Sequence, residues 1–256
     1  MKIVFHKRYF DSSYAMDPAA APGRLEGIVE ILSNNIDFEF IEPKPATTED
    51  ILRAHTERHY RYVKRDPLLL ELASLAAGGA ILAAEEAHNG NPTFAVIRPP
   101  GHHASADSCW GFCYFNNISI SLLKLFSEGK IKSAFVLDFD LHTGDGNINI
   151  LTFRNDNFRV KILNPDSSGR TGYLKEVQSY MEDLDNIDIF VASAGFDQGI
   201  EDWGHLLYPE DYSELGQLMK EYSNKLCKGR RFALLEGGYN HDVLPKNVYS
   251  FCNGFR

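Results

Sequence analysis

Four short apolar segments, alternating with helical patterns, constrain the fold of this chain more than any other feature. The segments are rich in residues that suit buried strands, and they lie at residues 94–97, 134–137, 187–191 and 232–235. Apolar residues recur at helical spacing between most of them, as at 118–126 and 212–226. This alternation predicts an α/β fold with a central, mainly parallel sheet and helices on both faces.

The first ninety residues fit the same architecture. Residues 3–5 and 38–41 look extended, residues 23–32 have helical spacing, and a capping-box-like start at Thr48 predicts one helix that runs towards Val63. The segment 68–84 is the main candidate for a membrane span, but it contains a glutamate, a serine and a glycine pair. We therefore expect it to be a buried core helix that ends near residue 89.

Size and composition limit the function classes. The 256 residues suffice for one large domain, and we expect a single domain over residues 1–256. A net charge of -9 argues against nucleic-acid binding. The N-terminus lacks the pattern of a signal peptide, and the four cysteines form no CxxC pair, which favours a reduced, cytoplasmic compartment. Cys109 or Cys113 as a metal ligand is the minor alternative, and oligomeric state cannot be predicted from this sequence.

Each of the four apolar segments is followed by residues capable of chemistry. In chain order these are His102 and His103, then Asp138, Asp140, His142 and Asp145, then Asp197, and finally Tyr239. In open parallel sheets, ligands bind at the carboxyl ends of the strands. The sequence therefore predicts that these side chains meet at one edge of the sheet.

The pattern Asp138-x-Asp140-x-His142 has period-two spacing, which would direct all three side chains to one face of an extended segment. Asp140, His142 and Asp197 would give three oxygen and nitrogen ligands, as in a catalytic zinc site with an open position. Iron(II) or another divalent ion also fits such ligands.

Two carboxylates would neutralise a divalent ion and weaken it as a Lewis acid, so we expect help from other groups. Tyr239 could donate a hydrogen bond to the developing oxyanion. His102 or His103 could take the proton from the attacking water, with Asp138 and Asp145 available to orient the imidazoles.

At this point the chain resembles the histone deacetylase and acetylpolyamine amidohydrolase superfamily. The resemblance rests on residues 98–104, 111–117, 138–146, 193–197 and 235–240, and it extends to residues 22–26 and 55–56. These segments occur in family order over nearly the whole chain. Glu236 and the lack of a second domain make the chain look like the short, class II-like prokaryotic members.

The resemblance implies an arginase–deacetylase type of α/β fold and a zinc-dependent amidohydrolase. Such an enzyme removes an acetyl or other short acyl group from acetyl-lysine, an acetylpolyamine or another small N-acylated amine, by means of metal-activated water. It also implies a role for each site residue. Asp140, His142 and Asp197 bind the metal; His103 is the general base, with His102 as its electrostatic partner; Asp138 orients His102 and Asp145 orients His103; Tyr239 polarises the carbonyl; Gly111 and Phe112 line the substrate tunnel. A structural potassium ion is implied near residues 138–142.

The chain also departs from the family pattern. The rim loop at 64–68 is short, and only Asp66 offers an acidic residue there. Residues 164–170, rich in polar side chains, stand where the family often has an aromatic residue of the opposite tunnel wall, which predicts a more open or more polar channel. Residues 164–172 are the stretch in which we expect the least ordered structure. Trp203 could be a rim residue or, as we favour, a packing residue, and Arg24 could hold an interior carbonyl or carboxylate or, as the resemblance implies, assist acetate release.

Two other functions stay open at this level. A ureohydrolase of the arginase type would carry two manganese ions, but the sequence offers no second set of ligands for them. A binding protein could keep the metal site and do no chemistry.

Overall fold

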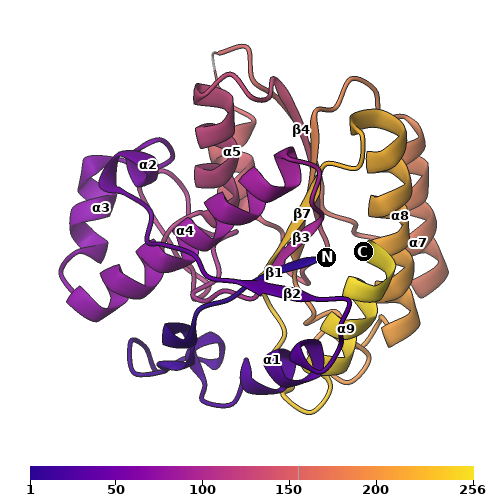
Figure 1. The fold of residues 1–256 in the computed structure, drawn as a ribbon, viewed down its shortest axis with the longest axis horizontal. Coiled ribbons are helices and arrows are strands. Elements are labelled where there is room, and N and C mark those ends of the chain that lie inside the picture. Colours follow the sequence, from indigo (N-terminus) through magenta and orange to yellow (C-terminus); the bar gives the residue numbers. More distant parts are fainter. Residues whose placement is uncertain (155) are drawn as a thin grey trace.

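The computed structural model describes residues 1–154 and 156–256, and its centre is one seven-stranded sheet in the order β2-β1-β3-β7-β6-β4-β5 (Figure 1). Every neighbouring pair of strands runs parallel. The strands are β1 (Lys2–Val4), β2 (Glu39–Ile41), β3 (Thr93–Ala95), β4 (Ser133–Asp138), β5 (Arg159–Leu163), β6 (Ile189–Ala194) and β7 (Arg231–Leu235). The predicted parallel α/β fold is therefore confirmed.

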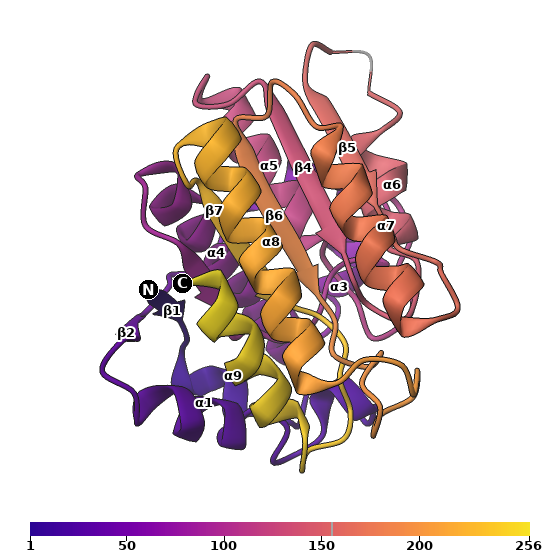
Figure 2. The ribbon, with the colours of Figure 1, turned by 90° about the vertical axis from the view of Figure 1, so that its right-hand side faces the viewer.

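Helices cover both faces of this sheet, as predicted. They are α1 (Glu26–Ser33), α2 (Thr48–Leu52), α3 (Glu57–Val63), α4 (Pro67–His88), α5 (Asn117–Ser127), α6 (Asp145–Leu151), α7 (Arg170–Glu182), α8 (Pro209–Cys227) and α9 (Leu244–Phe255), with short 3₁₀ turns at Lys7–Phe10 and Pro18–Ala20. Helices α4 and α5 pack together on one side, and α7, α8 and α9 lie on the other (Figures 1 and 2). The four central strands β3, β4, β6 and β7 are buried along their whole length, which explains their near-continuous apolar sequences.

The long apolar helix α4 belongs to the core. Among the described residues it is the one helix that is long and apolar enough to cross a membrane by length and composition, but 67% of its most apolar 18-residue window is buried. Its glycines permit close packing, since a Cβ on Gly78 would lie 1.8 Å from the carbonyl oxygen of Lys44. The expected buried core helix is confirmed.

The single helix predicted from Thr48 towards Val63 is wrong, because the chain breaks between α2 and α3. Thr47, not Thr48, caps α2 in a capping box with Asp50. Thr56 then caps α3 by accepting a hydrogen bond from the backbone of His59. At the break, His55 and Thr56 bind a loop that is distant in sequence.

Candidate active site

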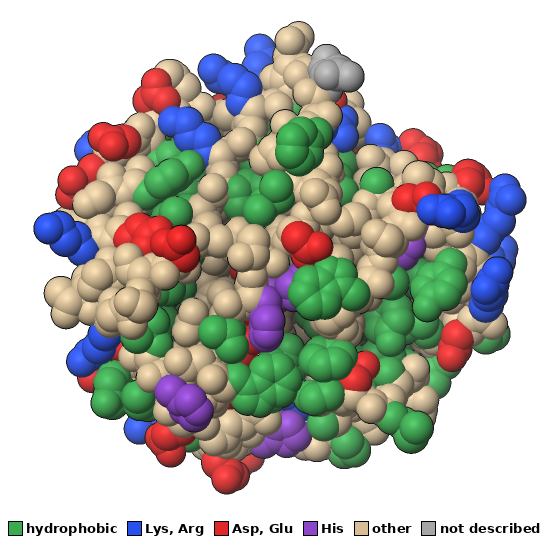
Figure 3. Space-filling view, turned by 180° about the vertical axis from the view of Figure 1, so that it is seen from behind, with side chains coloured by type: hydrophobic (Ala, Val, Ile, Leu, Met, Phe, Trp, Pro, Cys, Tyr) green, Lys and Arg blue, Asp and Glu red, His purple; other side chains and the backbone are tan. Residues whose placement is uncertain are grey.

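The four strands that carry the candidate residues are consecutive in the sheet, in the order β3-β7-β6-β4. Because all four run parallel, their carboxyl ends lie at the same edge. The predicted convergence is therefore confirmed at the level of topology. From behind, histidine side chains lie near the middle of the molecular face, bordered by hydrophobic side chains (Figure 3).

Asp140, His142 and Asp197 form a compact set of potential metal ligands. One ligand atom from each lies within 4.8 Å of the others. Nδ1 of His142 is 3.2 Å from Oδ1 of Asp140 and 3.2 Å from Oδ2 of Asp197. Both carboxylates are buried, and the imidazole is 39% exposed.

The electrostatics of this set favour a cation at its centre. Burial, together with the neighbouring Asp140, raises the pKa of Asp197 to about 7. The adjacent carboxylates of Asp140 and Asp197 raise the pKa of His142 to about 10. Oδ2 of Asp197 is buried with no well-aligned hydrogen-bond donor among the described residues. A divalent ion would relieve the repulsion between the carboxylates and satisfy that oxygen, so the residues fit a metal.

Backbone groups from neighbouring strand ends hold the carboxylates in place. The amide of Leu141 donates to Asp197 at 2.9 Å, and the amide of Gly237 donates to Asp140 at 2.8 Å. Glycine is needed at positions 195 and 237, because a Cβ on Gly195 would lie 2.1 Å, and one on Gly237 2.5 Å, from Oδ2 of Asp140. The carboxylate positions are therefore set by the sheet itself.

The local geometry behind this site differs from the prediction. Strand β4 ends at Asp138, and the chain bends through Asp140 to His142, so period-two alternation does not align the three side chains. Asp138 instead faces His102, with Oδ2 3.3 Å from Nδ1 of the imidazole. The expected extended segment is wrong, although Asp140 and His142 still meet.

His102 lies between carboxylates in the buried interior. Its Nε2 is 3.8 Å from Oδ1 of Asp140, in addition to its contact with Asp138. Burial alone would lower the pKa of His102, but Asp140 and Asp138 outweigh burial and raise that pKa well above its usual range. Glu236 is also buried, its pKa is raised to about 7 by burial, and its carboxylate accepts hydrogen bonds from the amides of Gly101 and His102. These amides fix the turn that presents the histidine pair.

His103 has a different environment, in which it can act as a base. Its Nδ1 donates to Oδ1 of Asp145 at 2.6 Å, which leaves Nε2 as the acceptor. Burial and the adjacent His102 lower the pKa of His103. A neutral imidazole whose tautomer is fixed by a carboxylate is suited to proton transfer.

Trp110 completes this arrangement and was missed in the sequence. Its indole Nε1 donates to Oδ2 of Asp145 at 2.9 Å, and its ring lies 3.8 Å from the ring of His103, centroid to centroid. Trp110 is also 55% exposed. Its position immediately before Gly111 was the one available signal, because the segment 111–117 already carried the resemblance.

The two predicted tunnel residues, Gly111 and Phe112, form a tight turn against the base. Both have positive φ angles, 57° and 65°. A Cβ on Gly111 would lie 2.4 Å from Cδ2 of His103, so only glycine fits there. The left-handed backbone of Phe112 directs its ring to a T-shaped contact with Tyr239, with centroids 5.9 Å apart.

Tyr239 and Trp203 form a second aromatic pair at the site, in addition to the Trp110 ring over His103. Their rings stack at 4.0 Å and Trp203 is 47% exposed, so Trp203 both packs on the tyrosine and presents part of its ring at the surface. The amide of Tyr239 donates to Asp202 at 2.7 Å, which holds the tyrosine's backbone. Burial, with a further contribution from Asp140, raises the pKa of Tyr239, so its hydroxyl keeps its proton and can act as a hydrogen-bond donor.

Other expectations are settled by single contacts. Arg24 is buried and donates to the backbone carbonyls of Gly238 and Glu236, so it holds interior carbonyls. Asp66 accepts hydrogen bonds from the first amides of α4 and so caps that helix, while its rim role stays a prediction. Near the implied potassium site, the carbonyl of Asp138 already accepts a hydrogen bond from the Asn164 amide at 3.2 Å.

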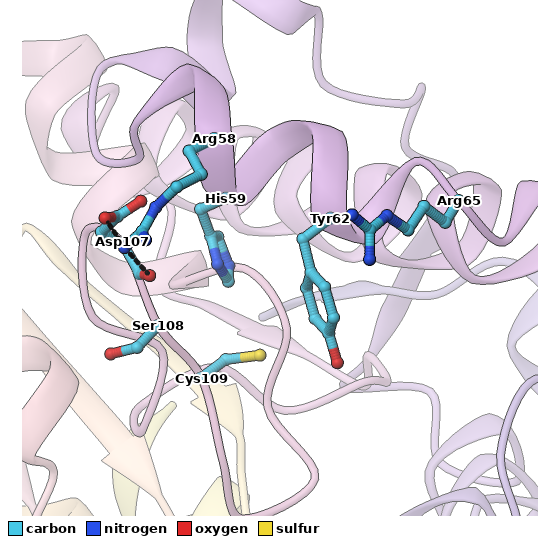
Figure 4. Close-up of a pocket in the computed structure, with 7 residues that line it drawn as sticks. All are labelled: Arg58, His59, Tyr62, Arg65, Asp107, Ser108 and Cys109. Atoms are coloured by element: carbon cyan, nitrogen blue, oxygen red, sulfur yellow. Dashed lines mark hydrogen bonds and ion pairs between the residues drawn. The ribbon is translucent and has the colours of Figure 1, made fainter.

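The cysteines do not join the Asp140–His142–Asp197 set. Among the described residues, Cys113 lies with His102 and Glu236 in a second buried group, and Cys109 belongs to neither. The sulfur of Cys109 instead points into a separate pocket of about 370 Å³ between α3 and residues 107–109 (Figure 4). The ion pair of Arg58 and Asp107 closes one end of that pocket (Figure 4).

Side chains at the start of α3 anchor the loop that carries Trp110, Gly111 and Phe112. His55 contacts the carbonyl of Ser105 at 3.0 Å and accepts from the amide of Asn116 at 2.8 Å. His59 contacts the carbonyl of Tyr114 at 2.7 Å. These bonds give His55 and His59 structural roles and fix both ends of the loop.

The segment 164–168 opens the site on the side of His142. A pocket of about 310 Å³ there is lined by the metal-ligand segment 140–143, by residues 164–168, and by Gln198, Gly204 and Leu206. The pocket has several polar side chains in its lining, and a channel more open or more polar than is usual in the family stays a prediction.

Comparisons with known proteins agree with this geometry. Residues 19–168 match the family described as histone deacetylase domain. The chain is 30% identical to a probable deacetylase of Archaeoglobus fulgidus, over 93% of this chain and 81% of the relative. It is 28% identical to a probable deacetylase of Methanothermobacter thermautotrophicus, over 98% of this chain and 90% of the relative. A histone deacetylase-like amidohydrolase of Pseudomonas aeruginosa is 23% identical, over 87% of this chain and 72% of that protein.

The fold also matches a solved structure. The crystal structure of the HDA15 HD domain superimposes with a TM-score of 0.82, at 22% identity, over 99% of this chain and 88% of that one. This similarity concerns the fold.

Proposed function

The chain belongs to the histone deacetylase domain family, and on that premise we propose that it is a zinc-dependent amidohydrolase. It would remove an acetyl or other short acyl group from an N-acylated amine, such as acyl-lysine or an acetylpolyamine. The observation that carries the proposal is the placement of the Asp140–His142–Asp197 set beside the His103–Asp145 pair and Tyr239. Three ligands, a base and a hydrogen-bond donor are the parts that hydrolysis of an amide needs.

Asp140, His142 and Asp197 would hold the ion, with iron(II) or another divalent metal as the alternative to zinc. When bound, such an ion supplies Lewis-acid activation of water and of the scissile carbonyl. The remaining steps belong to side chains of this chain.

His103 would manage the proton. Its Nδ1–H is committed to Asp145, so Nε2 is the atom that accepts a proton from the attacking water. As the C–N bond breaks, the same Nε2 returns that proton to the leaving amine nitrogen, and the acyl group leaves as a carboxylic acid. The lowered pKa of His103 keeps the base neutral before each turnover.

His102 and Tyr239 would stabilise charge. The raised pKa of His102 places a positive charge between Asp138 and Asp140, where it limits the negative charge of the site. The Tyr239 hydroxyl would donate to the carbonyl oxygen as it becomes an oxyanion. Gly111 and Phe112 would bound the acylated chain on the side of His103.

Replacement of His103 by Ala and of Tyr239 by Phe tests this mechanism. Each group acts in the transition state, so we expect kcat to fall by about 100-fold or more while circular dichroism stays unchanged. His241→Ala and Tyr180→Phe are matched controls, because neither residue lies in the site. Undiminished turnover in both site variants would refute the mechanism.

Metal counting separates this function from an arginase-type ureohydrolase. The second buried ligand group, His102 with Cys113 and Glu236, shares no residue with the first, so it offers no carboxylate that bridges two ions. One catalytic transition ion per chain supports the deacetylase, whereas two manganese ions support the ureohydrolase. Chelator-sensitive release of acetate from any N-acetylated amine removes the binding-protein alternative. A cytoplasmic location and the absence of nucleic-acid and membrane partners remain predictions from composition.

A further inference from the structure

The pocket beside His142 contains polar groups that the proposed mechanism does not use. It begins at the metal-ligand segment 140–143 and extends to residues 164–168 and to Gln198. Its volume of about 310 Å³ is at the small end of ligand pockets and suits a substituent of a few heavy atoms. Because Asp140 and His142 belong to its lining, a group bound there would lie beside the metal-ligand set.

The wall formed by residues 164–168 is an ordered structure. Glu176 of α7 accepts hydrogen bonds from the amides of Asp166 and Ser167, at 3.3 and 3.2 Å, and from the hydroxyl of Ser167 at 2.8 Å. At the start of the segment, the Asn164 side chain donates to the carbonyl of Asp138. The wall is therefore tied both to α7 and to the end of β4.

Gln198 is the most informative residue of the lining. The residue is only 9% exposed, and its carboxamide makes no hydrogen bond to another residue in the described ranges 1–154 and 156–256, although solvent in the pocket still reaches its polar atoms. Gly204 leaves room for it, because a Cβ there would lie 2.4 Å from Oε1 of Gln198. The carboxamide is therefore free to pair with a ligand, and a ligand that displaced its water without pairing with it would leave it unsatisfied, which costs affinity.

Two further groups face the same pocket without a partner in the described structure. The carboxylate of Asp166 and the hydroxyl of Ser168 both belong to the lining, and neither has a side-chain hydrogen bond. Together with Gln198, they offer both donors and acceptors, which suits hydroxyl groups because these also donate and accept.

We propose that this pocket binds hydroxyl groups carried on carbons close to the amine nitrogen, so that the substrate is a branched, hydroxylated N-acyl amine. This inference rests on the proposed function and specifies its substrate class. An unbranched methylene chain would leave the carboxamide of Gln198 unpaired, whereas a hydroxylated branch would satisfy it. Such differences in hydrogen bonding give strong discrimination between substrates.

The test compares two acetylated amines in the metal-loaded enzyme: N-acetylglucosamine, which is branched and hydroxylated, and N-acetylbutylamine, which is neither. We expect kcat/KM to favour the hydroxylated compound by at least about tenfold. Gln198→Leu should lower that preference by about five- to tenfold through loss on the hydroxylated compound alone. Asp166→Ala should act in the same direction, and it serves if the Leu variant fails to fold. Gln217→Leu, on the exposed side of α8, is the matched control.

A binding measurement makes the test independent of turnover. Both tryptophans of the chain, Trp110 and Trp203, lie at the site, so intrinsic fluorescence reports on binding of the product amines glucosamine and butylamine. We expect Gln198→Leu to raise the Kd of glucosamine by about five- to tenfold and to leave that of butylamine unchanged.

The possible failures are distinguishable. If the wild-type enzyme prefers the unbranched compound, or if Gln198→Leu and Asp166→Ala leave both the preference and the Kd of glucosamine unchanged, the pocket proposal is wrong and the deacylase function stands. If no N-acylated amine undergoes chelator-sensitive hydrolysis, the proposed function is wrong, and the fluorescence titration then decides whether the pocket still selects hydroxylated amines.

Discussion

Trp110 is expected to position the catalytic base through Asp145. Its indole N–H and the imidazole of His103 bind the two oxygens of the same carboxylate, at 2.9 and 2.6 Å. Trp110→Phe removes the N–H and keeps an aromatic ring over His103. The variant therefore isolates one hydrogen bond.

The size of the effect follows from the exposure of Asp145. Hydrogen bonds to charged groups contribute about 1.5–3 kcal/mol, but the Asp145 side chain is 40% exposed, so we expect about 1 kcal/mol. This corresponds to a loss of about fivefold in kcat/KM. Trp110→Ala also removes the ring contact, worth about 0.5–1.5 kcal/mol more, so the loss should reach roughly 10- to 50-fold.

Steady-state kinetics with a fluorogenic acetyl-lysine reporter measures this prediction, with metal content checked for each variant. Because Trp110 acts through the base, Trp110→Phe should lower kcat and leave KM nearly unchanged. Trp110→Gln, which restores a donor without the ring, should recover part of the loss relative to Ala. Tyr62→Phe is the control, since this exposed tyrosine lies on α3 away from the site. The reasoning fails if Trp110→Phe matches the wild type within twofold, or if only KM changes.

Three further predictions concern pH and metal. Burial and His102 lower the pKa of His103, and His103 acts as a base only when neutral. The acid limb of the kcat/KM profile should therefore lie at a pH below the usual pKa range of histidine. Trp110→Ala exposes the His103 ring, so it should move this acid limb to higher pH. Zinc at about 100 times its Kd should stabilise the fold by about 2.7 kcal/mol, or roughly 5–10 °C in Tm by calorimetry, and Asp197→Ala should abolish this shift. Burial lowers the pKa of His55 from 6.5 to about 3, so the unfolded chain binds more protons than the native one between these values and stability is lost as pH falls through this window. Urea unfolding should show a loss of about 2 kcal/mol between about pH 6.5 and 5, and His55→Gln, which cannot titrate, should show a smaller loss.

The central sheet could be predicted because its strands are buried on both faces. Strands β3, β4, β6 and β7 therefore appear in the sequence as short apolar runs with polar residues at their ends. Edge strand β5 is partly exposed and mixes charged with apolar residues, so periodicity alone did not identify it. The helix break before Thr56 was missed because its cause is a loop about fifty residues later, to which His55 is bonded.

The candidate site, like the fold, could be predicted from the sequence only in part. The metal ligands and the histidine pair could be predicted because strand order places them together, whatever the details of the bends. The roles of Trp110 and Trp203 depend on the directions of exposed side chains, which no spacing rule encodes. Asp66 was noted only as the acidic residue of the rim loop, and its role as the N-cap of α4 was missed.

The anchoring of the 105–116 loop has a consequence for how the molecule opens. The bonds of His55 and His59, with the amide of Thr56 donating to the carbonyl of Ala106 at 2.8 Å, join the start of α3 to the aromatic wall over the base. The start of α3 and the 105–116 loop should then lose hydrogen-exchange protection together, as one cooperative unit, while the amides of β4, β6 and β7 stay protected. Local unfolding at the start of α3 would thus expose His103 without moving the carboxylates of Asp140 and Asp197 at the sheet edge.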